Sequence, residues 1–181
     1  MRKFLLRQAV WLPLGGMLLP MFIGFLVPGY SSIRQHMSEL ELLSSGVSLV
    51  TRLGALLSGL SIIGFAVALL MRKPMMFTAV SAFVFGLSMV SNGVFKMGSP
   101  LHGLYAIGLS VIVVPAFFAA EGPKPADRFS LFISTIALIY MWALMTGIDP
   151  SATRGLTQRL ATIAMFGWSG YASFILLRNE G

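Results

Sequence analysis

Residues that are able to bind a ligand or take part in catalysis gather in three short polar segments of the chain. These segments contain Arg34, His36, Ser38, Glu39 and Glu41; Lys96 and His102; and Asp149, Arg154 and Arg159. Long apolar stretches separate the three segments, and no Asp, Glu, Lys, Arg or His lies near the middle of any stretch. Because ion-coupled transport and proton relays usually need an ionisable side chain at mid-membrane, this pattern argues against a secondary transporter.

Two kinds of catalytic site can be assembled from these residues. His36 and His102, with Glu39 or Asp149, would supply the three protein ligands of a catalytic zinc, although the close spacing of His-x-x-x-His is absent. Ser38, His102 and Asp149 would form a Ser-His-acid triad, without an elbow motif around the serine. The chain has no cysteine, so thiolate metal sites are excluded. We expect neither a metal nor another cofactor.

The elements that must position these residues are membrane-spanning helices. The chain has 181 residues, of which 56% are hydrophobic and only 10% are charged, whereas a soluble domain carries about 25% charged residues. Six apolar stretches of the length that crosses a bilayer follow one another, each bounded by charges, proline or glycine. They cover about 8–28, 48–71, 75–95, 102–120, 129–147 and 157–177. We therefore predict an all-α membrane protein, a single domain over 1–181 built as a bundle of six transmembrane helices.

The basic residues predict the orientation of this bundle. The formal net charge is +7, but the Lys and Arg residues are scattered between apolar runs and form no face for a nucleic acid. With the N-terminus inside, the cytoplasmic side holds eight of them, among them Arg2, Arg72, Lys73 and Arg178, and the outer side holds five. Since cytoplasmic loops carry the excess of positive charge, we predict that both termini are cytoplasmic. All three polar segments then lie outside.

The first outer loop contains a helix-start pattern. In Ser38-Glu39-Leu40-Glu41 the serine can accept a hydrogen bond from the backbone N–H of Glu41, and Glu41 can reach back to the N–H of Ser38. We expect a short helix that starts near Ser38 and lies in the outer interface or folds over the bundle. In this interpretation Ser38 and Glu41 serve to start the helix. The capping pattern gives His36 no role and accounts less fully for Glu39, so these two residues are better candidates for ligand binding.

Two motifs resemble those of a known family. The segment Tyr30 to Leu40 and the stretch from Phe95 to His102-Gly103 are similar to the bacterial membrane proteins of domain-of-unknown-function family 998. The resemblance covers nearly the whole chain and implies that Ser38, Glu39, Leu40, His102 and Gly103 match family positions. It implies six helices and no established reaction. Family members tend to carry an acidic residue before the histidine, and residues 96–101 contain none.

We expect a binding protein of the bacterial inner membrane. Its ligand would be a membrane lipid or small amphiphile, held at the outer mouth by His36, Ser38, Glu39 and His102. Arg34 or Arg159 would pair with a lipid phosphate. One alternative is an accessory subunit of a larger membrane assembly or homodimer, for which small residues at four-residue spacing, such as Gly54 and Ser58, offer a packing face. The other alternative is a membrane-embedded hydrolase.

Overall fold

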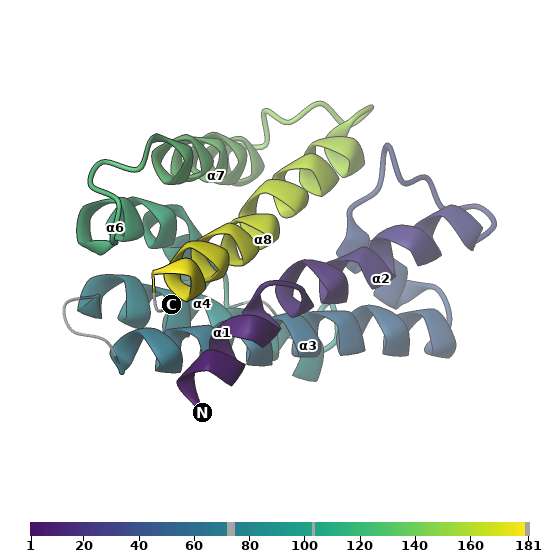
Figure 1. The fold of residues 1–181 in the computed structure, drawn as a ribbon. Coiled ribbons are helices and arrows are strands. Elements are labelled where there is room, and N and C mark those ends of the chain that lie inside the picture. Colours follow the sequence, from purple (N-terminus) through teal and green to yellow (C-terminus); the bar gives the residue numbers. More distant parts are fainter. Residues whose placement is uncertain (72–74, 103, 180–181) are drawn as a thin grey trace.

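The computed structural model describes residues 1–71, 75–102 and 104–179, and every regular element within them is a helix (Figure 1). The helices are α1 (Arg2–Ala9), α2 (Leu12–Leu26), α3 (Ser45–Leu70), α4 (Met76–Val94), α5 (Tyr105–Gly108), α6 (Val113–Glu121), α7 (Arg128–Thr146) and α8 (Arg154–Arg178), with 3₁₀ turns η1 (Met37–Leu42) and η2 (Leu109–Ile112). The predicted positions Arg72, Lys73 and Gly103 lie outside the described residues.

Five helical segments are long and apolar enough to cross a membrane by length and composition, among the residues that the structure describes. They are Arg2–Leu26, Ser45–Leu70, Met76–Val94, Arg128–Thr146 and Arg154–Arg178. Five of the predicted spans therefore correspond to these helical segments, the first of which consists of α1 and α2. These are the features of a membrane-embedded protein, because hydrocarbon offers no partner for the backbone polar groups that a helix satisfies internally.

The predicted span 102–120 is the exception, because it is not one continuous α-helix. It is divided into α5, η2 and α6, and only Leu109–Glu121 forms an apolar helix of intermediate length. Pro115 explains the irregular geometry: it has no N–H, and its ring crowds the carbonyl of Val111, which lies in η2. The hydroxyl of Ser134 on α7 donates to the carbonyl of Ile112 at 2.5 Å and so supplies a partner at this point.

Prolines also shape the first span. Pro13 lies at the start of α2, and the residue four positions before it, Ala9, is the last residue of α1. The helix therefore changes direction where the proline cannot continue the backbone ladder. On α3, the hydroxyl of Ser58 donates to the carbonyl of Pro13 at 2.7 Å, which fixes the bend against the neighbouring helix.

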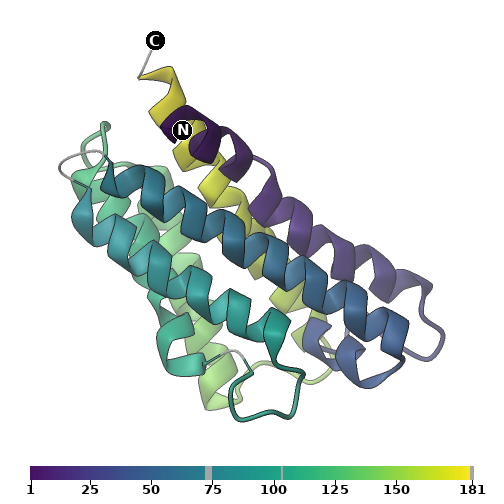
Figure 2. The same ribbon diagram turned by 90° about the horizontal axis from the view of Figure 1, so that it is seen from below.

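Glycines bring neighbouring helices into close contact inside the bundle. A Cβ atom at Gly16 of α2 would lie 2.6 Å from the carbonyl oxygen of Gly54 on α3. A Cβ at Gly59 of α3 would lie 2.7 Å from the backbone nitrogen of Val90 on α4. Figure 2 shows α3 and α4 running side by side over their length. The small residues at Gly54 and Ser58 thus pack within the chain, as bundle-forming helices in membranes do.

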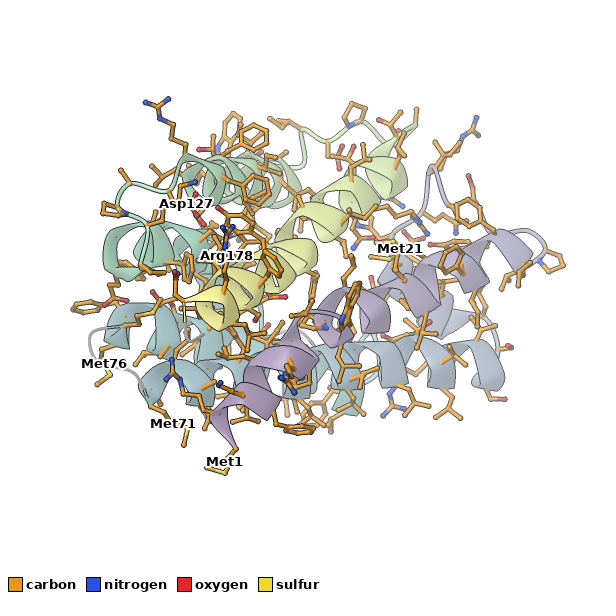
Figure 3. All side chains as sticks on the ribbon, in the orientation of Figure 1. Met1, Met21, Met71, Met76, Asp127 and Arg178 are labelled. Carbon is orange, nitrogen blue, oxygen red and sulfur yellow. The ribbon has the colours of Figure 1, made fainter. Side chains whose placement is uncertain are left out.

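The loops between the helices gather at the two ends of the bundle. At one end, which we call the loop end, residues 27–36 meet residues 147–153 and the start of α8, and the N–H of Leu156 donates to the carbonyl of Ile33 at 3.0 Å. The opposite end carries both termini. Figure 3 labels Met71, Met76 and Asp127 toward this terminal end, whereas Met21 lies toward the loop end.

Candidate functional site

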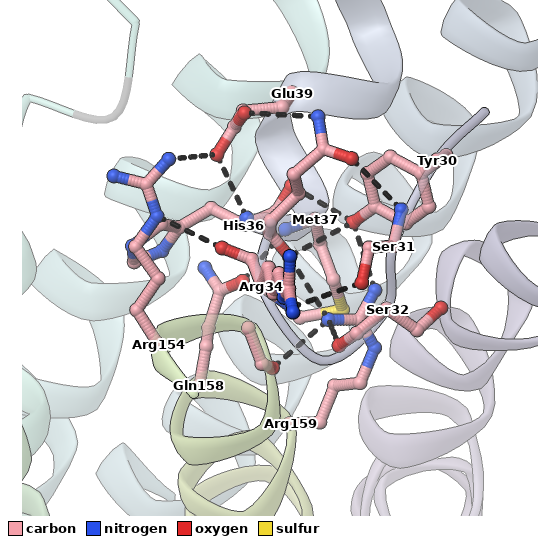
Figure 4. Close-up of polar contacts among 12 residues, drawn as sticks. Tyr30, Ser31, Ser32, Arg34, His36, Met37, Glu39, Arg154, Gln158 and Arg159 are labelled. Atoms are coloured by element: carbon pink, nitrogen blue, oxygen red, sulfur yellow. Dashed lines mark hydrogen bonds and ion pairs between the residues drawn. The ribbon is translucent and has the colours of Figure 1, made fainter. Parts of the chain in front are cut away.

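The first loop is fastened to α8 by a buried arginine. Only 6% of Arg159 is exposed, and its Nη1 donates to the carbonyl oxygens of Ser32 at 2.5 Å, Gln35 at 3.1 Å and Gly155 at 2.9 Å. Its Nη2 donates to the hydroxyl of Tyr30 at 2.8 Å. Figure 4 shows how these groups surround the guanidinium. The carbonyl oxygens of the loop therefore stabilise the positive charge of the guanidinium in place of water. Most of its N–H donors are used within the chain.

A second arginine of α8 holds the same loop through a carboxylate. Glu39 accepts a hydrogen bond from Nη2 of Arg154 at 3.2 Å, and Nε of Arg154 donates to the carbonyl of Arg34 at 2.9 Å. The same Oε1 of Glu39 accepts from the backbone N–H of His36 at 2.9 Å. Glu39 thus stabilises the start of η1 and joins it to α8 (Figure 4).

These contacts correct the predicted capping box. A short helix does form in this loop, but it begins at Met37, with His36 at the N-cap position and Glu39 three residues later. The expected pairing of Ser38 with Glu41 is wrong. The reason is a tertiary contact. The side-chain oxygen of Gln158 on α8 accepts a hydrogen bond from the backbone N–H of Met37 at 2.6 Å, and this contact makes the short helix begin at Met37, one residue before Ser38.

His36 lies in a partly buried position between the loop and α8. Burial lowers the pKa of its imidazole from the usual 6.5, and the nearby guanidinium of Arg154 lowers it further, against the opposing effects of Glu39 and Asp149. The hydroxyl of Tyr30 lies 2.9 Å from the carbonyl oxygen of His36. The neutral imidazole is therefore favoured in the folded protein.

A cavity of about 180 Å³ lies between η1 and the helices beneath it. Its apolar wall is made largely of flexible sulfur-containing and aromatic side chains. These are Met17, Met37, Met89, Met141, Met165, Phe85 and Phe166. Polar side chains also line it, namely Ser38, Glu41, Thr51, Ser88, Asn92, His102, Tyr140, Gln158 and Thr162. An apolar wall with a limited set of polar groups is the usual composition of a small-molecule site, and methionines adapt readily to the shape of an occupant.

Glu41 is the only acidic residue among the described residues that line this cavity. It is 2% exposed, and its Oε2 accepts from the backbone N–H of Met97 at 2.8 Å. Burial raises the pKa of its carboxyl group above 4.5, although the Met97 N–H and the positive charges of His102, Arg52 and Lys96 act in the opposite direction. A buried carboxylate that lines a cavity and has a pKa raised by burial is a candidate binding or catalytic group.

His102 enters the cavity from the segment that follows α4. It is 8% exposed, and its Nδ1 lies 2.8 Å from the carbonyl oxygen of Phe95. Since a carbonyl only accepts, Nδ1 carries a proton, and Nε2 is the ring nitrogen left for another partner. The hydroxyl of Ser91 donates to the carbonyl of Leu101 and so holds the chain just before the histidine. The prediction that His102 begins a helix is wrong, because α5 starts at Tyr105.

The predicted site residues therefore fall into two groups. Ser38 and His102 line the cavity, whereas His36, Glu39, Arg34 and Arg159 do not. Arg34 is exposed, and the other three belong to the contacts between the first loop and α8. Within the described residues no group of three His, Cys, Asp or Glu converges, so the zinc set of His36, His102 and a carboxylate is not assembled by them.

The comparisons with known proteins assign the family. The family model described as "Protein of unknown function (DUF998)" matches residues 13–174 of the chain. The chain belongs to the DUF998 family. Neither the curated proteins nor the solved structures gave a match. The resemblance drawn from residues 30–40 and 95–103 is thus confirmed, and both segments fall inside the matched range of this DUF998 protein.

Sequence reasoning missed several residues of the cavity in this DUF998 chain. The capping pattern predicts only a structural role for Glu41, and no sequence motif singles out Gln158 or Asn92. The signal for Glu41 was available, because it is one of only six acidic residues in the chain and lies in the same polar segment as Ser38. For Gln158, one turn from Arg154 and next to Arg159, the position at the start of the last span was the available indication.

Proposed function

We propose that this protein binds a small amphiphile in the cavity beneath η1. The single observation that carries the proposal is the convergence of two separate segments on one cavity whose remaining wall is mainly apolar: η1 supplies Ser38 and Glu41, and the segment after α4 supplies His102. The polar end of the ligand lies against these three residues. Its apolar part lies among the methionines, which adjust to chains of different shape.

The size of the cavity limits the ligand. An apolar cavity of about 150 Å³ accommodates benzene, and the cavity here measures about 180 Å³. The bound group is therefore a short aliphatic chain or a single ring, or one end of a larger lipid. Of the expected membrane lipid or small amphiphile, this volume favours the small amphiphile or one end of a lipid. Arg34, which is exposed, remains part of the proposal as a group that interacts with lipid phosphate at the membrane surface, whereas Arg159 contributes by holding the first loop in place.

We further propose that the protein lies in the bacterial inner membrane with the loop end outside and both termini in the cytoplasm. The distribution of Lys and Arg supports this orientation. Because the chain has no cysteine, single-cysteine variants report topology directly. Ser31→Cys should react with an impermeant maleimide in intact cells, and Lys124→Cys should react only after lysis. The reverse pattern would contradict the orientation.

A cavity-filling variant tests the binding proposal. Ala55 on α3 is 7% exposed and lines the cavity, whereas Leu60 on the same helix is 60% exposed. Terminally fluorinated hexanol, a flexible chain somewhat larger than benzene, serves as the probe, and fluorine NMR is recorded on protein in lipid nanodiscs. We expect a saturable bound signal for the wild type and for Leu60→Phe, and its loss in Ala55→Phe. The same signal in all three proteins, or in empty nanodiscs, would show that the probe dissolves in the lipid and does not bind in the cavity. That result would contradict the proposal.

A second candidate is a hydrolase, favoured by one observation. Ser38 and His102 line the same cavity, and Nε2 of His102 is the atom that a general base would use. Within the described residues no hydrogen bond joins Ser38 to His102. Short-chain p-nitrophenyl esters provide the test: turnover that Ser38→Ala and His102→Gln both abolish would favour the hydrolase, and turnover unaffected by either variant would remove it.

A further inference from the structure

Several polar atoms at the cavity have no partner within the described part of the chain. They include Oγ of Ser38, Oε1 of Glu41, Nε2 of His102 and Nε2 of Gln158. None of them is among the side-chain nitrogen and oxygen atoms that are both buried and unpaired. These atoms are therefore accessible, and their residues line the cavity. They are the groups with which the polar end of a ligand can form hydrogen bonds.

The strongest of these groups is the carboxylate of Glu41. The Met97 N–H fixes one of its oxygens, which leaves the other as an acceptor from an already buried and oriented side chain. An unpaired negative charge in such a position carries a desolvation cost, which a bound cation or hydrogen-bond donor would offset. The charge of the nearby Arg52 reduces this cost in part, but its Nε and Nη2 donate to the carbonyls of Gly93 and Val94 at 2.9 Å and 2.6 Å and not to Glu41.

His102 adds a second acceptor at the same cavity. Its Nδ1–H is held by the carbonyl of Phe95, so Nε2 is the ring atom left for a ligand, and it accepts a hydrogen bond when the ring carries a single proton. In contrast, no Lys or Arg is found among the described residues that line the cavity. An anionic head group, such as a phosphate or carboxylate, would be repelled by Glu41 and would find no lysine or arginine to pair with among these lining residues.

From this arrangement we infer that the cavity selects an amphiphile with a hydrogen-bond-donating head, and specifically a primary aliphatic amine, whose ammonium group contacts Glu41 and His102. The inference rests on the proposed function and specifies its ligand class. The ammonium supplies donors to Oε1 of Glu41 and Nε2 of His102, while the hydroxyl of Ser38 accepts from it. The aliphatic chain occupies the apolar wall between Met89 and Phe85.

Three probes that differ only in the head group test the inference. Terminally fluorinated hexylamine, hexanol and hexanoate are titrated into the wild-type protein in nanodiscs made of neutral lipid, with empty nanodiscs and Ala55→Phe as controls. We expect the amine to bind at least about tenfold more tightly than hexanoate, the factor for one charge-assisted hydrogen bond, with hexanol between them. Glu41→Gln keeps an oxygen for the Met97 N–H and removes the charge. It should weaken amine binding about tenfold and leave hexanol binding within about threefold.

The outcomes separate the two proposals. Hexanol binding that Ala55→Phe removes, together with equal or tighter binding of hexanoate than hexylamine, would overturn the head-group inference and leave the cavity as a binding site. Amine binding that Glu41→Gln leaves unchanged would also overturn the inference. Probe signals that Ala55→Phe does not alter would overturn the proposed function itself. The ranking of the three probes on the wild-type protein needs no variant, so a folding defect of Glu41→Gln does not prevent the test.

Discussion

Replacement of Arg159 tests whether this buried cation holds the first loop in place over the cavity. Arg159→Met keeps much of the volume of the side chain and removes the donors to the carbonyls of Ser32, Gln35 and Gly155 and to the hydroxyl of Tyr30. With a net contribution of about 1 kcal/mol for each hydrogen bond and some cost for the carbonyls left without a partner, the expected loss is about 3–5 kcal/mol.

Thermal unfolding in a mild detergent measures this loss. A loss of about 1 kcal/mol lowers the midpoint of a chain of this size by about 2–4 °C, so Arg159→Met should lower it by roughly 6–20 °C. Arg159→Lys should fall between this variant and the wild type, because an ammonium keeps the charge but does not span the same set of acceptors.

Arg34→Met is the matched control, since Arg34 belongs to the same loop, is exposed, and forms no side-chain hydrogen bond within the described residues. We expect it to change the midpoint by only about 1–2 °C, as for other exposed positions. Equal midpoints for Arg159→Met and Arg34→Met would refute the assignment of Arg159 to the loop and would favour a role at the membrane surface alone.

Three further predictions concern packing, helix capping and pH. Gly59→Ala should lower stability by about 1–3 kcal/mol, because its Cβ would lie 2.7 Å from a backbone nitrogen of α4, whereas Gly15→Ala, which meets nothing within 4 Å, should be neutral or slightly stabilising in thermal unfolding. Asp127→Ala should lower stability by about 1–3 kcal/mol, because this fully buried carboxylate accepts hydrogen bonds from the hydroxyls of Ser130 and Tyr171. The control is Lys124→Ala, which should change little in the same assay, because the Lys124 side chain is 65% exposed and its Nζ lies 4.0 Å from Oδ1 of Asp127. His36 has a pKa below 6.5 in the folded protein, so its contribution to stability is complete above pH 6.5 and is lost as the pH falls from 6.5 through the folded pKa. His36→Gln should therefore flatten this part of the curve of unfolding midpoint against pH. An unchanged slope would contradict the placement of His36 in a partly buried site.

The positions of most helices could be predicted from the sequence because membrane insertion depends on local properties. Length and apolar composition suffice to recognise Ser45–Leu70 or Arg154–Arg178 as candidate spans. The interruption of 102–120 was harder to predict, since proline is tolerated in many membrane helices. Its effect depends on a neighbouring partner, and here that partner is Ser134 on α7.

The site could be predicted only in part, because its contacts join residues that are far apart in the chain. Glu41 accepts from Met97, which is 56 positions away, while a capping rule considers only residues three positions apart. Arg159 reaches carbonyls more than 120 positions before it. The sequence indicated that polar residues gather at one end of the bundle. It did not indicate which of them face a cavity and which hold a loop.

An experimental density map of the protein purified in lipid tests the central claim most directly. We predict that the space bounded by Glu41, His102 and Met89 is open and holds an elongated molecule, with its polar end within hydrogen-bonding distance of the Glu41 carboxylate. Side chains that close this space, or a Glu41 that points away from it, would contradict the proposed binding site.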